Sequence, residues 1–91
     1  MKRGIVMSKI AEFYGFEVFM DSTFSGEPQI FINYSEDNIK GHYNIEKGIF
    51  EDVEFPNYLI DVICDWISDN IQLLKKMWSS RTILAVPEWE E

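Results

Sequence analysis

Hydrophobic residues recur at helical spacing between positions 57 and 78 more clearly than anywhere else in the chain. Placed ~100° apart on a helical wheel, they form one broad apolar arc. The arc contains Leu59, Ile60, Val62, Ile63, Trp66, Ile67, Leu73, Leu74, Met77 and Trp78. On the opposite, polar side Asp61 and Asp65 come early and Lys75 and Lys76 come late, which is the charge order that the helix dipole favours. The pattern predicts one long amphipathic helix.

The ends of this helix also carry local signals. Proline is tolerated in a first helical turn, which suits Pro56, and asparagine is a favoured N-cap, which suits Asn57. The polar residues 79–81 predict the end of the helix. Asn70 is the one polar residue that the wheel places inside the apolar arc, where an amide needs partners. We therefore expect its side chain to bond to sheet or loop backbone; a ligand-binding role is the alternative.

Four segments upstream of the helix alternate between apolar and polar residues with the period of a β-strand. They cover residues 16–21, 29–34, 39–45 and 49–53. The loop at 46–48 ends in Gly48, which suits a hairpin position that needs a positive φ. The residues predicted to face the core are Phe16, Val18, Met20, Ile30, Ile32, Tyr34, Ile39, Tyr43 and Ile45.

The two flanks complete the predicted fold. Residues 7–15 are expected to form a short helical turn that Ser8 caps and Gly15 ends. Residues 82–86 are a candidate fifth strand at the edge of the sheet, 1–6 a loose extension and 87–91 an acidic tail. The prediction is a single α+β domain over residues 1–91, with an antiparallel four-stranded meander packed against one long C-terminal helix.

Composition agrees with one small domain. The 91 residues are 46% hydrophobic, which is enough for a single compact core. No apolar run reaches the ~20 residues that span a bilayer, and the first residues lack the apolar stretch of a secretory signal. We therefore expect a cytoplasmic protein with no membrane contact. Cys64 falls among the apolar residues of the helix, so a packed and inert thiol is expected.

Charge is concentrated in the middle of the chain. The net charge is −8, and residues 10–69 hold thirteen acidic residues against only Lys40 and Lys47. Such a surface repels phosphates, which argues against direct nucleic-acid binding. It favours a protein partner with a basic surface, although a merely solubilising role is an equal alternative.

The acidic residues are expected to gather at one end of the domain. Because residues 55–57 leave room for only a short connection, the end of the last strand and the start of the helix should lie close together. The helix continues the acidic series with aspartates four residues apart, which could contact a cationic partner or a divalent metal, or simply be solvated. The predicted partner-binding residues are Glu51, Asp52, Glu54, Asp61, Asp65 and Asp69.

Catalytic motifs are missing from the sequence. His42 is the single histidine, and it falls on the outward face of a predicted strand. The chain has no cysteine pair for zinc, no glycine-rich loop before a helix and no nucleophile elbow. We therefore assign no catalytic, cofactor-binding or metal-binding residue and expect a protein that is not an enzyme.

Several of these segments resemble a known family. The I-A-E-F-Y-G stretch at 10–15, the segment 28–34, the hairpin at 46–48, and Trp66 and Trp78 twelve residues apart are similar to the small bacterial proteins of the domain of unknown function 4160. The resemblance covers roughly residues 7–86. It implies a protein encoded in a pair that resembles a toxin–antitoxin operon.

The chain departs from this family at its histidines. Members commonly carry P-P-H-F-H where residues 27–31 read E-P-Q-I-F here, and they often have histidine at the position of Asn70. The departure implies that any histidine chemistry of the family is lost, which favours binding over catalysis. Our leading hypothesis is a small acidic protein-binding module of a toxin–antitoxin-like or phage-defence pair. The alternative is an acidic inhibitor that mimics nucleic acid in a basic cleft, and a toxin-type enzyme has the least support.

Overall fold

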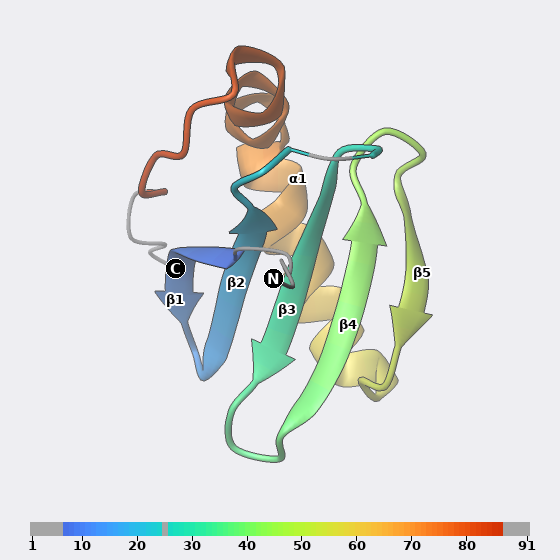
Figure 1. Ribbon diagram of the computed structural model, residues 1–91. Helices are drawn as coiled ribbons and strands as arrows, with labels where there is room; N and C mark the ends of the chain where they lie inside the picture. The colour runs from blue at the N-terminus through green and yellow to red at the C-terminus, as the bar shows by residue number, and fades with distance from the viewer. Residues whose placement is uncertain (1–6, 25, 87–91) are drawn as a thin grey trace, which may run out of the picture.

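The computed structural model describes residues 7–24 and 26–86. In this part of the chain, five strands precede one helix: β1 (Met7–Phe13), β2 (Phe16–Asp21), β3 (Gln29–Tyr34), β4 (Ile39–Asn44), β5 (Ile49–Val53) and α1 (Asn57–Ser80). The strands form one antiparallel sheet in chain order, and α1 crosses one face of it (Figure 1). The predicted α+β meander with a C-terminal helix is confirmed. The predicted extension at 1–6 and tail at 87–91 lie outside the described residues.

The helical turn predicted for residues 7–15 was wrong, because this segment forms β1 and the tight turn into β2. Tyr14 and Gly15 both have positive φ, 49° and 86°. Two consecutive residues of this kind form the hairpin turn that matches the twist of a sheet. Gly15 therefore ends a strand and not a helix.

A β-bulge explains why the sequence of β1 resembles a helix. The pairing of β1 with β2 shifts register between Lys9 and Ala11, which leaves Ile10 as the extra residue. The bulge lets Ile10 and Phe13 both enter the core, with 2% and 7% of their surface exposed. Apolar residues three apart are typical of a helix, so the bulge conceals the two-residue period of the strand.

The fifth strand is thus β1, and the candidate edge strand at 82–86 is not a strand. These residues have no regular secondary structure. Among the described residues, one backbone hydrogen bond joins them to the sheet, from the N–H of Val86 to the carbonyl of Ile10 at 2.9 Å. The bulge at Ile10 interrupts the even spacing of hydrogen-bonding groups along this edge, which prevents a regular ladder.

The ends of α1 differ from the predicted ones by a residue or two. Pro56, not Asn57, is the N-cap residue, and no side chain caps the helix. Its carbonyl accepts the first backbone hydrogen bonds, from Leu59 and Ile60 at 3.0 and 3.1 Å. The helix continues past Trp78 to Ser80. Its first turn holds no acidic residue, and its last turn holds no basic residue. The predicted support from the helix dipole is therefore absent.

Within the described ranges, no helix combines the length and the apolar character needed to cross a bilayer.

The core lies between the sheet and α1, as the alternating patterns predict. Phe16, Val18, Met20, Ile30, Ile32 and Ile45 are buried, and Tyr34, Ile39 and Tyr43 are half-buried. From the apolar arc of the helix, the buried residues are Leu59, Ile63, Trp66, Ile67, Leu74, Met77 and Trp78. One face of the sheet is thus covered by the helix.

Asn70 bonds within its own helix and not to the sheet or a loop, contrary to the prediction. Its Nδ2 donates to the carbonyl of Trp66 at 2.9 Å, and the residue is half-buried. An α-helix already uses that carbonyl for the backbone bond four residues on, so the amide satisfies no group that would otherwise be unpaired.

Removing this amide should therefore cost little. Asn70→Ala is expected to change the free energy of unfolding by less than about 0.7 kcal/mol, with a small gain from the higher helix propensity of alanine. Urea denaturation of the variant measures this. A loss above ~1 kcal/mol would mean that the amide holds a group outside α1.

Candidate functional site

The face of the sheet opposite α1 carries the candidate site. Strand side chains alternate between the two faces, so the residues between the core positions point away from the helix. Cross-strand pairing places these outward residues in two neighbouring rows. We call this surface the open face; its central residues are Glu17, Phe19, Phe31, Asn33, Lys40, His42 and Asp52.

The first row is mainly aromatic. Phe19 pairs with Phe31 across β2 and β3, Phe31 with His42 across β3 and β4, and His42 with Asp52 across β4 and β5. The rings of Phe31 and His42 stack with centroids 4.5 Å apart and an interplanar angle of 14°. His42 Nε2 also forms a hydrogen bond with Gln29 Oε1. His42 thus lies on the predicted outward face, but it is half-buried and held by two neighbours.

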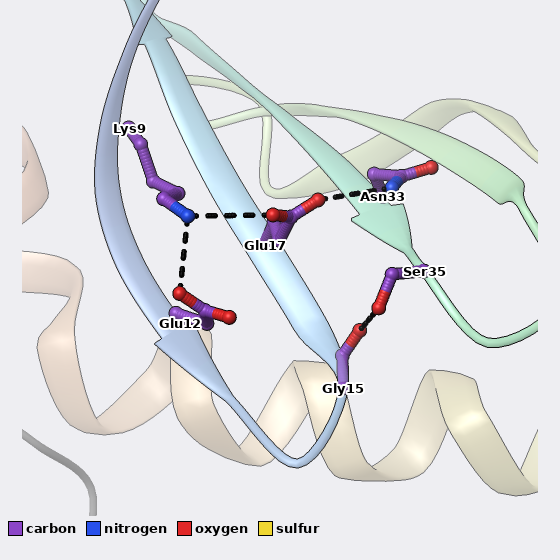
Figure 2. A network of polar contacts seen from close by, with 6 residues as sticks. All are labelled: Lys9, Glu12, Gly15, Glu17, Asn33 and Ser35. Carbon is purple, nitrogen blue, oxygen red and sulfur yellow. Dashed lines mark hydrogen bonds and ion pairs between the residues drawn. The ribbon is translucent and has the colours of Figure 1, made fainter.

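The second row is polar. Glu17 pairs with Asn33, and Asn33 with Lys40. Figure 2 shows the network at its β1 end: Lys9 Nζ contacts Glu12 at 3.0 Å and Glu17 at 3.3 Å, and Asn33 Nδ2 donates to Glu17 Oε1 at 3.1 Å. The hydrogen bond from Asn33, followed by the one from Lys9, lowers the pKa of Glu17. Glu17 is therefore held ionised and in a fixed position.

Asn33 has one group that this network leaves unsatisfied. Its Oδ1 is buried and accepts no hydrogen bond within the described part of the chain. Figure 2 shows this oxygen on the side of the amide that faces away from Glu17. Leaving a buried acceptor unpaired costs about 1–3 kcal/mol, so a donor placed there would be favourable.

A cavity of about 360 Å³ lies where the two rows meet β5. Aromatic side chains, charged side chains and the backbone of β3 and β4 line it. Its lining residues are Phe19, Phe31, Ile32, Asn33, Lys40, Gly41, His42, Asp52 and Glu54.

The two acidic residues of the cavity differ in their hydrogen bonds. Glu54 Oε1 accepts a hydrogen bond from the backbone N–H of Lys40 at 2.9 Å, which fixes this carboxylate beside β4. Within the described residues, Asp52 has no hydrogen bond or ion pair and is exposed. Asp52 thus presents a free carboxylate at the end of the aromatic row.

The structure places five of the six predicted partner-binding residues on two separate surfaces. β5 ends and α1 begins at the same end of the molecule, as expected (Figure 1). However, Asp52 and Glu54 line the cavity on the open face, whereas the aspartates of α1 lie beyond the other face of the sheet. Glu51 joins neither group, since it lies 3.7 Å from Lys47 and accepts a hydrogen bond from Asn44. The predicted partner-binding residues of the helix are all exposed: Asp61, Asp65 and Asp69.

Two further expectations concern the helix. Cys64 was expected to be packed, but it is exposed, because it lies at the margin of the apolar arc and not within it. Partial burial, and then the carboxylates of Asp61 and Asp65, raise the pKa of its thiol, which disfavours the nucleophilic thiolate. No group of three or more histidine, cysteine or acidic residues in the described ranges is arranged to hold a metal ion.

The site contains three residues that were not predicted from the sequence: Phe19, Phe31 and Asn33. A signal was present for two of them, since both phenylalanines occupy positions of β2 and β3 where an exposed face should carry polar residues. No local pattern marks Asn33, because its role depends on which residue of β2 it faces.

The fold and the site define a class: a small α+β module with a helix on one face of an antiparallel sheet and an aromatic, acid-bordered cavity on the other. Comparisons with protein-family models, with curated proteins and with solved structures find no match to this chain. The resemblance to the domain of unknown function 4160 stays a prediction.

Proposed function

We propose that this chain is a small acidic protein-binding module whose open face docks on a basic surface of another protein. The observation that carries the proposal is the aromatic row beside the free carboxylate of Asp52. Aromatic anchors bordered by polar groups are typical of protein interfaces. Phe19, Phe31 and His42 are half-buried on a sheet face that nothing in the described chain covers.

Charge supports the choice of a basic partner. The chain has a net charge of −8, and the cavity holds two carboxylates against one ammonium group, that of Lys40. A complementary positive surface would accelerate association and suppress acidic competitors. The contacts of His42 with Phe31 and Gln29 favour a structural part in such an interface over a catalytic one.

The biological setting in this proposal comes from the resemblance to the domain of unknown function 4160. It would make the chain one member of a toxin–antitoxin-like or phage-defence pair in the cytoplasm. In that reducing compartment, the lone exposed thiol of Cys64 would stay reduced.

A pair of matched charge reversals tests which surface binds. The partner is captured from a lysate of the native host, purified, and titrated by isothermal calorimetry with the parent chain, Asp52→Lys and Asp65→Lys. Both variants change the charge equally at exposed positions, one on the open face and one on α1. Asp52→Lys should weaken binding about tenfold or more, as expected at a central interface position, whereas Asp65→Lys should not.

Two results would contradict the proposal. Weaker binding by Asp65→Lys alone would place the interface on the helix. Equal affinity of the partner for all three proteins would show that neither acidic surface belongs to the interface. Urea midpoints of the two variants serve as the folding control, since surface substitutions usually change stability by less than about 0.5 kcal/mol.

The nucleic-acid-mimicking inhibitor is a second candidate, and the exposed aspartates of α1 favour it. Asp61, Asp65 and Asp69 follow one another at a rise of about 6 Å along the helix, so they form a regular row of negative charge. A mimic that fills a basic cleft should lose affinity steeply as salt rises, whereas an interface anchored by aromatic residues should lose little. Repeating the titration at two salt concentrations distinguishes the candidates.

A further inference from the structure

We infer that the cavity on the open face is a binding site for the guanidinium group of an arginine side chain of the partner. The inference rests on the proposed function and adds the chemistry of the group that is recognised. The aromatic side chains of the cavity, its hydrogen-bonding groups and its charge support it.

The aromatic side chains of the cavity suit a flat cation. The rings of Phe31 and His42 stack face to face, so each ring keeps one face that the other does not cover, and Phe19 pairs with Phe31 on the neighbouring strand. A cation over an aromatic ring is attracted by the negative charge on the ring face. Guanidinium is planar, so it can also stack, and its weak hydration lowers the cost of entering a half-buried cavity.

The hydrogen-bonding groups around the cavity are mainly acceptors that lack donors. Asp52 has no partner within the described ranges, and Glu54 uses only Oε1, for the backbone of Lys40. Asn33 lines the cavity, and its buried Oδ1 also lacks a donor there. A guanidinium group carries five N–H donors and no acceptor, so one group can serve several of these oxygens.

The charge of the cavity argues against an anionic ligand. Two carboxylates and the ammonium group of Lys40 line the cavity, so its carboxylates outnumber its ammonium groups. A phosphate would meet Asp52 and Glu54 and would leave Asn33 Oδ1 unpaired. A lysine side chain has the right charge, but its compact, strongly hydrated ammonium group does not stack on a ring and has three donors where guanidinium has five.

The test uses three small probes with the full chain. N-acetyl-arginine methylamide is titrated into ¹⁵N-labelled protein and followed by two-dimensional NMR, in parallel with the lysine and citrulline analogues. Citrulline keeps the shape of arginine but has no charge. The arginine probe should shift the amides of β3 and β4 around the cavity, and the side-chain amide of Asn33, with a Kd on the order of millimolar. Lysine should bind at least fivefold more weakly, and citrulline should not saturate.

Matched variants assign the effect to the cavity. Asp52→Asn removes charge with little change of shape and should weaken the arginine probe severalfold, whereas Asp65→Asn on α1 should not. Phe31→Leu keeps an apolar side chain but removes the aromatic ring, and it should weaken arginine while leaving the spectrum that of a folded protein.

Each other outcome overturns the inference in a recognisable way. Equal affinity for lysine and arginine would remove the preference for guanidinium and leave a basic partner intact. Shifts confined to α1, or none with any probe, would remove the cavity as a cation site, while the titration of Asp52→Lys with the captured partner still decides the proposed function. Saturable shifts of Phe19 and Phe31 with a single-stranded RNA oligonucleotide, and not with arginine, would show base stacking and overturn both proposals.

Discussion

Replacing Trp66 with alanine should lower the free energy of unfolding by about 3–5 kcal/mol, the usual loss for a large aromatic residue in a core. The side chain has 0% of its surface exposed. Its ring stacks on Phe13 with centroids 5.0 Å apart and an interplanar angle of 18°, so it joins α1 to β1 within the core. Small domains are stable by only about 5–15 kcal/mol, so this loss is a large share of the total. Urea denaturation with a linear extrapolation measures it.

Tyr58 provides the matched control, because it is an aromatic residue on the same helix with 66% of its surface exposed. Tyr58→Ala should change stability by less than about 0.5 kcal/mol. If Trp66→Ala left the urea midpoint where it is in the parent chain, α1 would pack on the sheet through another face.

Replacing Gly41 with alanine should destabilise the fold by about 1–3 kcal/mol, as overpacking of a core does. A Cβ atom at this position would lie 2.7 Å from Cε2 of Phe55 and 3.3 Å from two further ring atoms. Phe55 is buried and packs edge-on against Phe16, with centroids 5.7 Å apart, so its ring cannot move freely. Phe55 also directly precedes Pro56 and α1, and any displacement of the ring would disturb the start of the helix.

A double-mutant cycle checks that this clash is the cause. Phe55→Leu alone should be destabilising, but it makes room for the new methyl group, so Gly41→Ala should cost less in that background than in the parent. Additive losses would show that the effect of Gly41→Ala arises from the strand backbone and not from the phenyl ring.

Local periodicity was enough to predict most of the fold. Buried residues recur at every second position over most of β2 and β3, and the apolar arc of α1 keeps helical spacing along the helix. In both cases the signal lies among neighbours in the sequence, because each face is buried along the full element. The same logic failed for β1, where the bulge at Ile10 breaks the alternation and Tyr14 adopts a positive φ that its side chain does not suggest.

The candidate site depends on pairings that no local pattern contains. The aromatic row takes Phe19, Phe31 and His42 from three successive strands, and Asp52 from a fourth. A shift of one residue in any pairing would send these side chains to the core face. The sequence showed that acidic residues are plentiful near the end of β5 and the start of α1, but not that the sheet separates them.

The sequence by itself therefore determined the elements with an unbroken period, the α+β class, the shared end of β5 and α1, and the acidic character of the surface. The tertiary structure alone decided the strand identity of residues 7–13, the cavity on the open face and the buried acceptor of Asn33. The physical reason is the distance along the chain between the residues that set each property. Periodicity and net charge follow from neighbouring residues and composition, whereas a cavity on a sheet requires strand register, and register is set by packing against a helix that comes after all five strands.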